Sequence, residues 1–97
     1  MTLEEALNQI DHLADDEVIF AKRPWRAVTE AQIGRLDENF GVPESLTGLN
    51  YEYFIDVPIA REVLGVLGSK RHSVQQRNEL LLYYAEHDAY PNWVYQI

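Results

Sequence analysis

The chain of 97 residues has 16 acidic residues against 8 Lys and Arg residues, a formal net charge of −8 and no cysteine. Its length fits a single domain, and a hydrophobic content of 46% is too high for a disordered chain. The lack of cysteine excludes disulfides, thiolate nucleophiles and Cys-ligated metal sites. The acidic balance argues against general nucleic-acid binding, which needs Lys and Arg to neutralise phosphates.

The start of the chain is acidic and amphipathic, unlike the basic start and apolar run of a secretory signal. No segment approaches the ~18–20 apolar residues that a membrane span requires. We therefore expect a cytoplasmic protein that does not bind membranes.

Residues 2–14 are predicted to form the first helix. Thr2 and Glu5 fit a capping box, in which the two side chains bind amides of the first turn. An apolar stripe with spacings of three and four follows, formed by Leu3, Ala6, Leu7, Ile10, Leu13 and Ala14.

Residues 17–22 are predicted to form a central strand. Four consecutive apolar residues from Val18 to Ala21 indicate burial on both faces. Pro24 ends this strand because it cannot donate to a β-ladder. Residues 28–36 fit a strand or a helix, and their weak alternation favours the strand. Gly34 weakens both assignments.

Residues 37–50 are predicted to form a long loop with one helical turn at residues 43–46. Residues 51–57 show the clearest strand pattern of the chain. Alternation places Tyr51, Tyr53, Ile55 and Val57 on the core face, and Glu52, Phe54 and Asp56 on the opposite face.

Two further helices are predicted. The first covers residues 58–67, with Pro58 in the first turn, where proline is tolerated, and Gly68 as its stop. The second covers residues 73–87 and begins with a second capping box, Ser73 to Gln76. The following residues are predicted to lie on its buried side: Val74, the stem of Arg77, Leu80, Leu81 and Tyr84.

Residues 88–97 are predicted to form a tail that docks as a short extended segment. The order of the elements predicts a single α+β domain over residues 1–97. Its architecture would be a small two-layer sandwich, with an antiparallel sheet of about three strands and about three helices covering one face.

No catalytic or metal signature is found. Glu86, His87 and Asp88 are adjacent and point in different directions, whereas metal ligands on a helix lie three or four residues apart. Glu52 and Asp56 would share a strand face ~13 Å apart, farther than the ~5–9.5 Å of catalytic carboxylate pairs. No nucleophile elbow surrounds any serine. These patterns favour a protein without catalytic activity, metal or cofactor, although catalytic groups can converge from distant positions.

Basic residues gather in two segments: Lys22, Arg23 and Arg26, and Lys70, Arg71, His72 and Arg77. If the fold brought them together, they could bind a phosphate or a carboxylate, and the helix start at Ser73 would add amide donors. An anion-binding site at Lys70, Arg71 and Arg77 is therefore one functional hypothesis. The protein would then be a binder of small anionic ligands, or an enzyme that acts on them.

The aromatic side chains are too many for the core of so small a domain. Tyr and Trp are favoured anchors at protein interfaces. Six candidates for partner binding follow from their predicted positions: Trp25, Phe54, Tyr83, Tyr90, Trp93 and Tyr95. Alternatively, these aromatics cover a thin core and the tail packs down.

The sequence favours a small bacterial-type accessory protein that binds another protein. Its acidic surface would steer a basic partner, and its exposed aromatics would anchor that partner. One concrete version is an immunity- or antitoxin-like role, which rests on size and charge. A homodimeric structural module is a further alternative.

Overall fold

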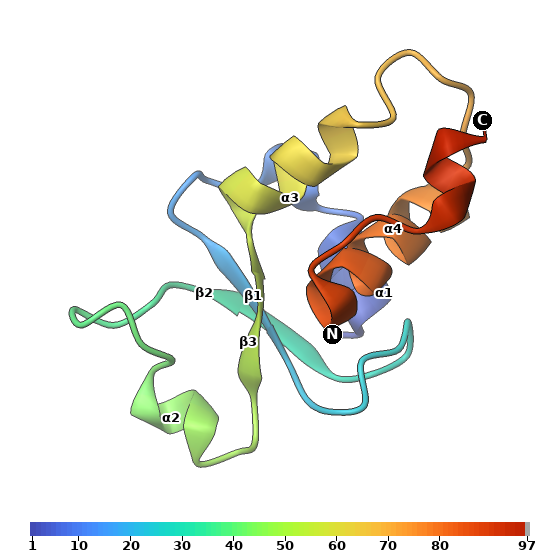
Figure 1. Ribbon diagram of the computed structural model, residues 1–97. Coiled ribbons are helices and arrows are strands. Elements are labelled where there is room, and N and C mark those ends of the chain that lie inside the picture. The colour runs from blue at the N-terminus through green and yellow to red at the C-terminus, as the bar shows by residue number, and fades with distance from the viewer. Residues whose placement is uncertain (97) are drawn as a thin grey trace.

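The sheet has three antiparallel strands in the order β2-β1-β3 (Figure 1), where β1 is Val18–Ala21, β2 is Ala31–Gly34 and β3 is Glu52–Asp56. The computed structural model describes residues 1–96, and Ile97, the last residue of the predicted tail, lies outside the described residues. β1 is the central strand, as its apolar run predicts. The segment that was ambiguous in sequence contributes the strand β2.

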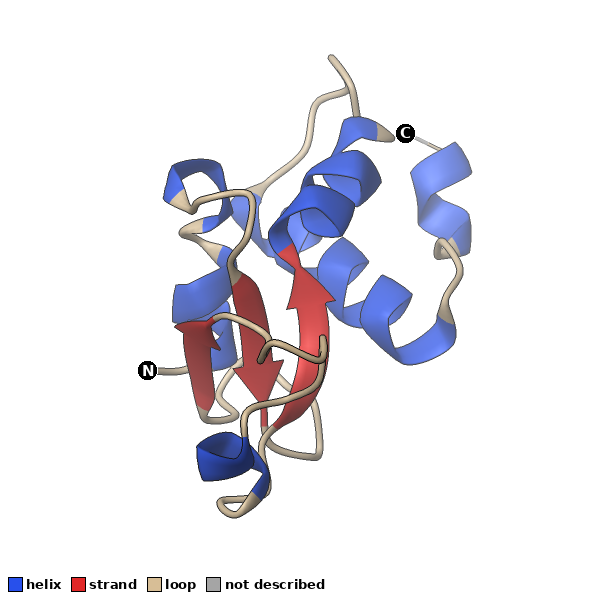
Figure 2. Ribbon diagram, turned by 90° about the vertical axis from the view of Figure 1, so that its left-hand side faces the viewer, coloured by secondary structure: helices blue, strands red, loops and turns tan. Residues whose placement is uncertain are grey.

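The helical elements are α1 (Leu3–Leu7), η1 (Ile10–His12), α2 (Glu44–Thr47), α3 (Val57–Gly65), α4 (Val74–His87) and η2 (Asn92–Tyr95), where η denotes a 3₁₀-helix. In Figure 1, α1, α3 and α4 lie on one side of the sheet and α2 lies on the other. Figure 2 views the sheet from the side of α2. The predicted α+β fold with an antiparallel three-stranded sheet is thus confirmed. The number of helices is larger than predicted, and a loop with α2 covers the second face.

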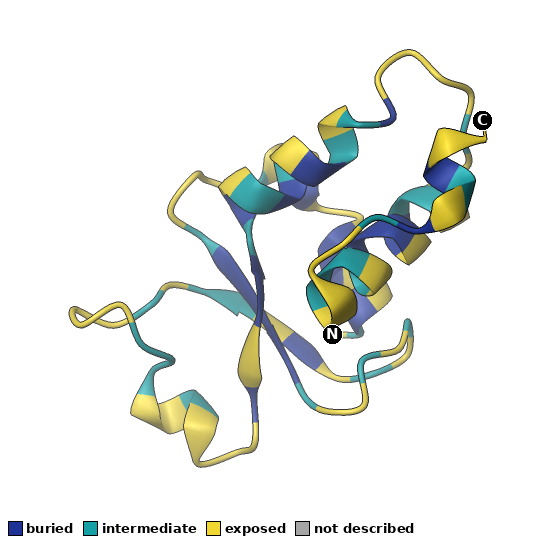
Figure 3. Cartoon of the chain, in the orientation of Figure 1, coloured by how far each residue is buried: buried dark blue, intermediate teal, exposed yellow. Residues whose placement is uncertain are grey.

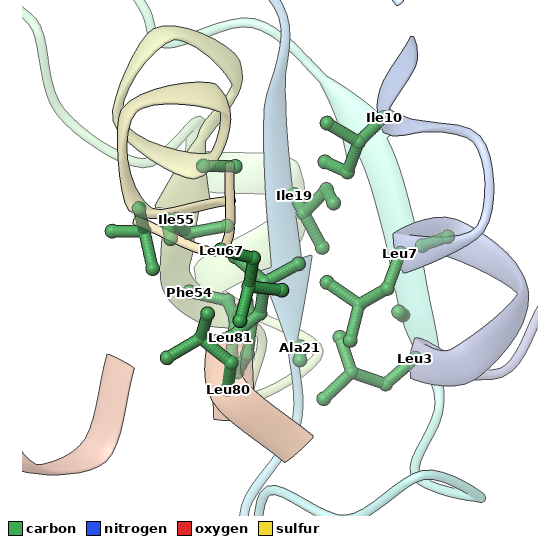
Figure 4. Packing of buried hydrophobic residues seen from close by; sticks show 14 of the residues in the cluster. Leu3, Leu7, Ile10, Ile19, Ala21, Phe54, Ile55, Leu67, Leu80 and Leu81 are labelled. Atoms are coloured by element: carbon green, nitrogen blue, oxygen red, sulfur yellow. The ribbon is translucent and has the colours of Figure 1, made fainter. Parts of the chain in front are cut away.

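The core has two parts, one on each face of the sheet. Ile19 and Ala21 of β1 contact the main cluster, to which α1, α3 and α4 contribute (Figure 4). Val18 and Phe20 point to the opposite face, where they pack with Tyr51. The loop after β2 covers this second cluster with Leu36, Val42 and Leu46. β1 is accordingly buried along its whole length (Figure 3), which confirms the predicted burial on both faces.

The first helix is shorter than predicted. Its capping box is present, but α1 ends at Leu7 and the 3₁₀-helix η1 follows. A continuous α-helix would bond the Ala14 N–H to the Ile10 carbonyl. Instead, the Ala14 N–H donates to Glu17 Oε1 (2.8 Å), and the Ile10 carbonyl accepts from the Arg61 guanidinium (3.2 Å). Contacts with residues outside the helix therefore replace the last helical hydrogen bonds.

A β-bulge in β3 overturns the alternation predicted for this strand. Ile19 pairs with Ile55, whereas the next residue of β1, Phe20, pairs with Tyr53. Phe54 is thus the extra residue of the bulge, which shifts the side chains around it. Phe54 and Ile55 both enter the main core cluster at 2% exposure, while Tyr53 is 37% exposed. The prediction that Tyr53 faces the core and Phe54 does not is wrong.

The C-terminal third of the chain follows the prediction with three differences. The capping box at the start of α4 is present. Val74 was predicted to be buried but is 59% exposed. α3 ends at Gly65 rather than at residue 67. The tail contains the short helix η2 and docks through Val94, which is fully buried.

Among the described residues, no helix has the length and apolarity needed to cross a membrane.

Candidate functional site

Three of the six aromatic candidates meet in one open groove of about 470 Å³. Trp25 follows β1, Tyr83 lies on α4, and Trp93 lies on η2. We call this site the aromatic groove, and its lining residues are Trp25, Glu79, Leu82, Tyr83, Glu86, His87, Pro91 and Trp93. The fold thus brings together residues that are up to 68 positions apart in the sequence.

One face of α4 forms a wall of the aromatic groove. Its lining residues at positions 79, 82, 83 and 86 have the three- and four-residue spacing of neighbours on a helix surface. Glu79 and Glu86 place carboxylates beside the aromatic rings, and Tyr83 packs against His87 with ring centroids 4.4 Å apart. The two carboxylates were not among the predicted site residues, although helical spacing from Tyr83 could have identified them.

Trp25 is held firmly in the groove. Its ring packs edge-on against Phe54, with centroids 4.9 Å apart, and the Arg23 guanidinium lies 3.5 Å from the ring centroid. Arg23 is itself fixed by ion pairs with Glu86 and Glu52. The Trp25 Nε1–H is buried without an acceptor among the described residues, and an unsatisfied donor of this kind costs ~1–3 kcal/mol. Despite this cost, the contacts with Phe54 and Arg23 fix the Trp25 ring before any partner binds.

The other three aromatic candidates lie elsewhere. Phe54 is almost fully buried and supports Trp25 from beneath, so its predicted exposure is wrong because of the bulge. Tyr90 is half-buried and packs against Tyr84, with centroids 5.7 Å apart. Tyr95 is 70% exposed and does not line the aromatic groove. Only Tyr95 of these three offers an exposed ring.

The predicted anion-binding residues are mostly engaged within the protein. Lys70 Nζ donates to the Val94 carbonyl (3.3 Å), and Arg77 forms an ion pair with Asp11 (3.4 Å). Arg71 is exposed and forms no ion pair with the described residues. In Figure 1 the loop before α4 lies at the top and the loop after β1 lies in the lower half, so the two loops that carry most of the basic residues do not meet.

The carboxylates considered for catalysis have structural partners. Glu52 pairs with Ala21 across the sheet and Asp56 pairs with Val18, and these two β1 residues point to opposite faces. The prediction that Glu52 and Asp56 share a face is therefore wrong. Within residues 1–96, no group of three His, Asp or Glu residues has a metal-binding arrangement.

Asp56 instead joins β3 to α3. It is the N-cap of α3, and its Oδ1 accepts from the Ile59 N–H (2.8 Å). Its Oδ2 accepts from the Tyr53 hydroxyl (2.9 Å), whose oxygen in turn accepts from the Asp56 N–H (3.1 Å). Partial burial, together with the hydrogen bond to Asp56, raises the pKa of Tyr53 to about 12.

The raised pKa of Tyr53 predicts a loss of stability at alkaline pH. The folded state favours the neutral phenol, so this contribution is complete below the ordinary value of 10.0 and is lost as the pH rises towards about 12. Denaturant titrations between these pH values should show a steeper fall in the free energy of unfolding for the native sequence than for Tyr53→Phe. An equal dependence of the free energy of unfolding on pH in the two proteins would contradict the raised pKa of Tyr53.

A second groove, of about 340 Å³, lies at the start of β1. We call it the acidic groove, and its lining residues are Asp15, Asp16, Glu17, Val18, Arg35, Leu36, Asp37, Phe40, Asp56 and Pro58. Sequence reasoning missed it. The run of carboxylates at residues 15–17 and a phenylalanine within a polar loop were the available signals, but nothing local connected them.

Ion pairs neutralise only part of the acidic groove. Arg35 bonds Asp16 at 2.7 Å, and this hydrogen bond lowers the pKa of Asp16. Asp15 is paired with Arg61, which lies outside the groove. The carboxylates of Glu17, Asp37 and Asp56 form no ion pair with the described residues. The groove thus keeps an excess of negative charge at neutral pH.

Comparison with known proteins gives no family for this chain. No family model matches it, and neither the curated proteins nor the solved structures contain a significant match. The functional argument therefore rests on the two grooves.

Proposed function

We propose that this protein is an interaction module that binds another protein through the aromatic groove. The observation that carries the proposal is the convergence of Trp25, Tyr83 and Trp93 from three separate segments into one open groove. Trp and Tyr dominate the binding energy of many interfaces because they bury a large area at a low cost in entropy.

The electrostatics of the groove favour a partner with a basic face. Glu79 borders the aromatic rings and forms no ion pair with the described residues, whereas the charge of Glu86 is compensated by Arg23; the chain as a whole has a net charge of −8. Complementary charge speeds association and selects against acidic partners. A basic protein that inserts an apolar side chain between Trp25 and Trp93 fits this combination. An immunity- or antitoxin-like role against a basic toxin is one form of this proposal.

The alternative functions have less support. Binding of a small anion would need several free cations, but of the three proposed residues Arg71 stands alone as exposed and unbound among the described residues, because Lys70 and Arg77 are already bound within the protein. Neither residue lines the aromatic or the acidic groove. A homodimer would bring two chains of charge −8 together, and like charges oppose such an association.

The test is a capture experiment with tagged protein in a lysate of its native host, followed by affinity measurements with the captured partner. Tyr83→Ala removes an exposed ring from the groove wall and should weaken binding about tenfold or more. Tyr95→Ala is the matched control, because it removes an even more exposed tyrosine outside the groove. It should leave the affinity within about twofold, a difference below 0.5 kcal/mol.

Three results would contradict the proposal. The first is that no stoichiometric partner is captured. The second is that Tyr83→Ala and Tyr95→Ala weaken binding equally. The third is that light scattering shows a dimer which Tyr83→Ala dissociates, because the groove would then be occupied by a second copy of the chain.

A further inference from the structure

Phe40 is exposed in a way that the fold does not explain. Its side chain is 83% exposed, the highest value among the exposed large hydrophobic residues. Its backbone has φ of 61°, in the left-handed region that bulky residues rarely adopt. The exposed ring contributes little to folding, and the backbone conformation opposes it. Such residues are concentrated at binding sites, where the surrounding structure holds them in place.

The turn that carries Phe40 is well defined. The Asp37 carboxylate Oδ1 accepts from the N–H groups of Asn39 (2.9 Å) and Gly41 (2.8 Å). The Asp37 N–H donates to the Gly41 carbonyl (2.8 Å), and the Asp37 carbonyl accepts from the Phe40 N–H (2.9 Å). These four hydrogen bonds hold the turn closed. The ring of Phe40 therefore projects from an ordered support.

Phe40 lines the acidic groove, whose other surfaces combine apolar and negative groups. Leu36 and Pro58 supply apolar surface over the buried Val18. Five carboxylates line the groove against a single guanidinium, that of Arg35. The groove combines an apolar surface, an aromatic side chain and excess negative charge. A long side chain with an apolar stem and a cationic end is complementary to all three. Arginine fits best, because its planar group stacks on aromatic rings and binds carboxylates through two hydrogen bonds.

We propose that the acidic groove is a second docking site, which takes an arginine-containing basic segment of a protein partner. The guanidinium would lie against the Phe40 ring within reach of Glu17 and Asp37, and its stem would cover the apolar surface. The site is at the start of β1, whereas the aromatic groove lies beyond the end of β1. The two sites can therefore be tested independently of each other.

The test uses an acetylated and amidated hexa-arginine peptide as the probe and two variants of the full chain. Phe40→Gly removes the ring and places glycine where φ is positive, so the melting temperature should be unchanged or higher. Glu17→Gln removes one charge and retains an oxygen that can accept from the Ala14 N–H. We expect peptide affinity to fall about fivefold or more for Phe40→Gly and about two- to threefold for Glu17→Gln.

Matched controls separate this site from general attraction to an acidic surface. Glu62→Gln makes the same change in net charge on α3, outside the groove, and Leu49→Ala removes another exposed apolar side chain. Both should leave affinity unchanged. Amide chemical shifts on peptide addition should change mainly at residues 15–18 and 36–41. Shifts spread over the whole surface, full binding by Phe40→Gly, or equal losses for Glu17→Gln and Glu62→Gln would each overturn the proposal.

Discussion

Phe54→Ala is expected to lower the free energy of unfolding by about 3–5 kcal/mol. The side chain is 2% exposed, belongs to the main core cluster and packs edge-on against Trp25. Its removal would leave a cavity between the sheet and the helices as well as an unsupported indole. For a domain whose total stability is ~5–15 kcal/mol, this loss is a large fraction. Chemical denaturation followed by circular dichroism measures it.

The neighbouring variant Tyr53→Ala is the control for the bulged register. Tyr53 is 37% exposed, so we expect its removal to cost about 1–2 kcal/mol, chiefly the two hydrogen bonds between its hydroxyl and Asp56. A strand without a bulge predicts the opposite order, because Tyr53 would then face the core. A larger loss for Tyr53→Ala than for Phe54→Ala would therefore contradict the pairing of Phe20 with Tyr53.

The bulge illustrates which part of the fold the sequence could predict. Strand β1 and the capping boxes at Thr2 and Ser73 depend on neighbouring residues, and their predictions were correct. The facing of Phe54 depends on how β3 pairs with β1, more than 30 positions earlier in the chain. An alternating sequence pattern assigns successive side chains to opposite faces of the strand. It cannot show where the extra residue of a bulge interrupts this alternation.

The candidate site likewise has one part that the sequence could predict and one part that it could not. The residue types that suit an interface could be recognised from composition, and three of the six candidates do line one groove. Their convergence was not predictable, because it depends on how α4 and η2 dock against the loop after β1. The contacts of the basic residues were unpredictable for a related reason. Arg77 looked free in the sequence, but its partner Asp11 is 66 positions away.

A side chain distant in sequence also caps η1, and Arg61→Met tests its contribution. The Arg61 guanidinium donates to the carbonyls of Ile10 (3.2 Å) and Leu13 (2.6 Å) and pairs with Asp15. Methionine retains an apolar stem but cannot donate to either carbonyl. We expect a loss of about 2 kcal/mol in the free energy of unfolding, because each hydrogen bond to a charged group contributes ~1.5–3 kcal/mol and this side chain is partly exposed. Chemical denaturation gives the value.

Asp15→Asn separates the carbonyl contacts from the ion pair. The Asp15 side chain is 84% exposed, and exposed ion pairs contribute only ~0–1 kcal/mol. We therefore expect Asp15→Asn to change stability by less than about 0.5 kcal/mol. Amide hydrogen exchange in residues 10–14 should accelerate in Arg61→Met and remain unchanged in Asp15→Asn. Equal losses for the two variants would mean that the ion pair, and not the capping of η1 by Arg61, holds the N-terminal segment against α3.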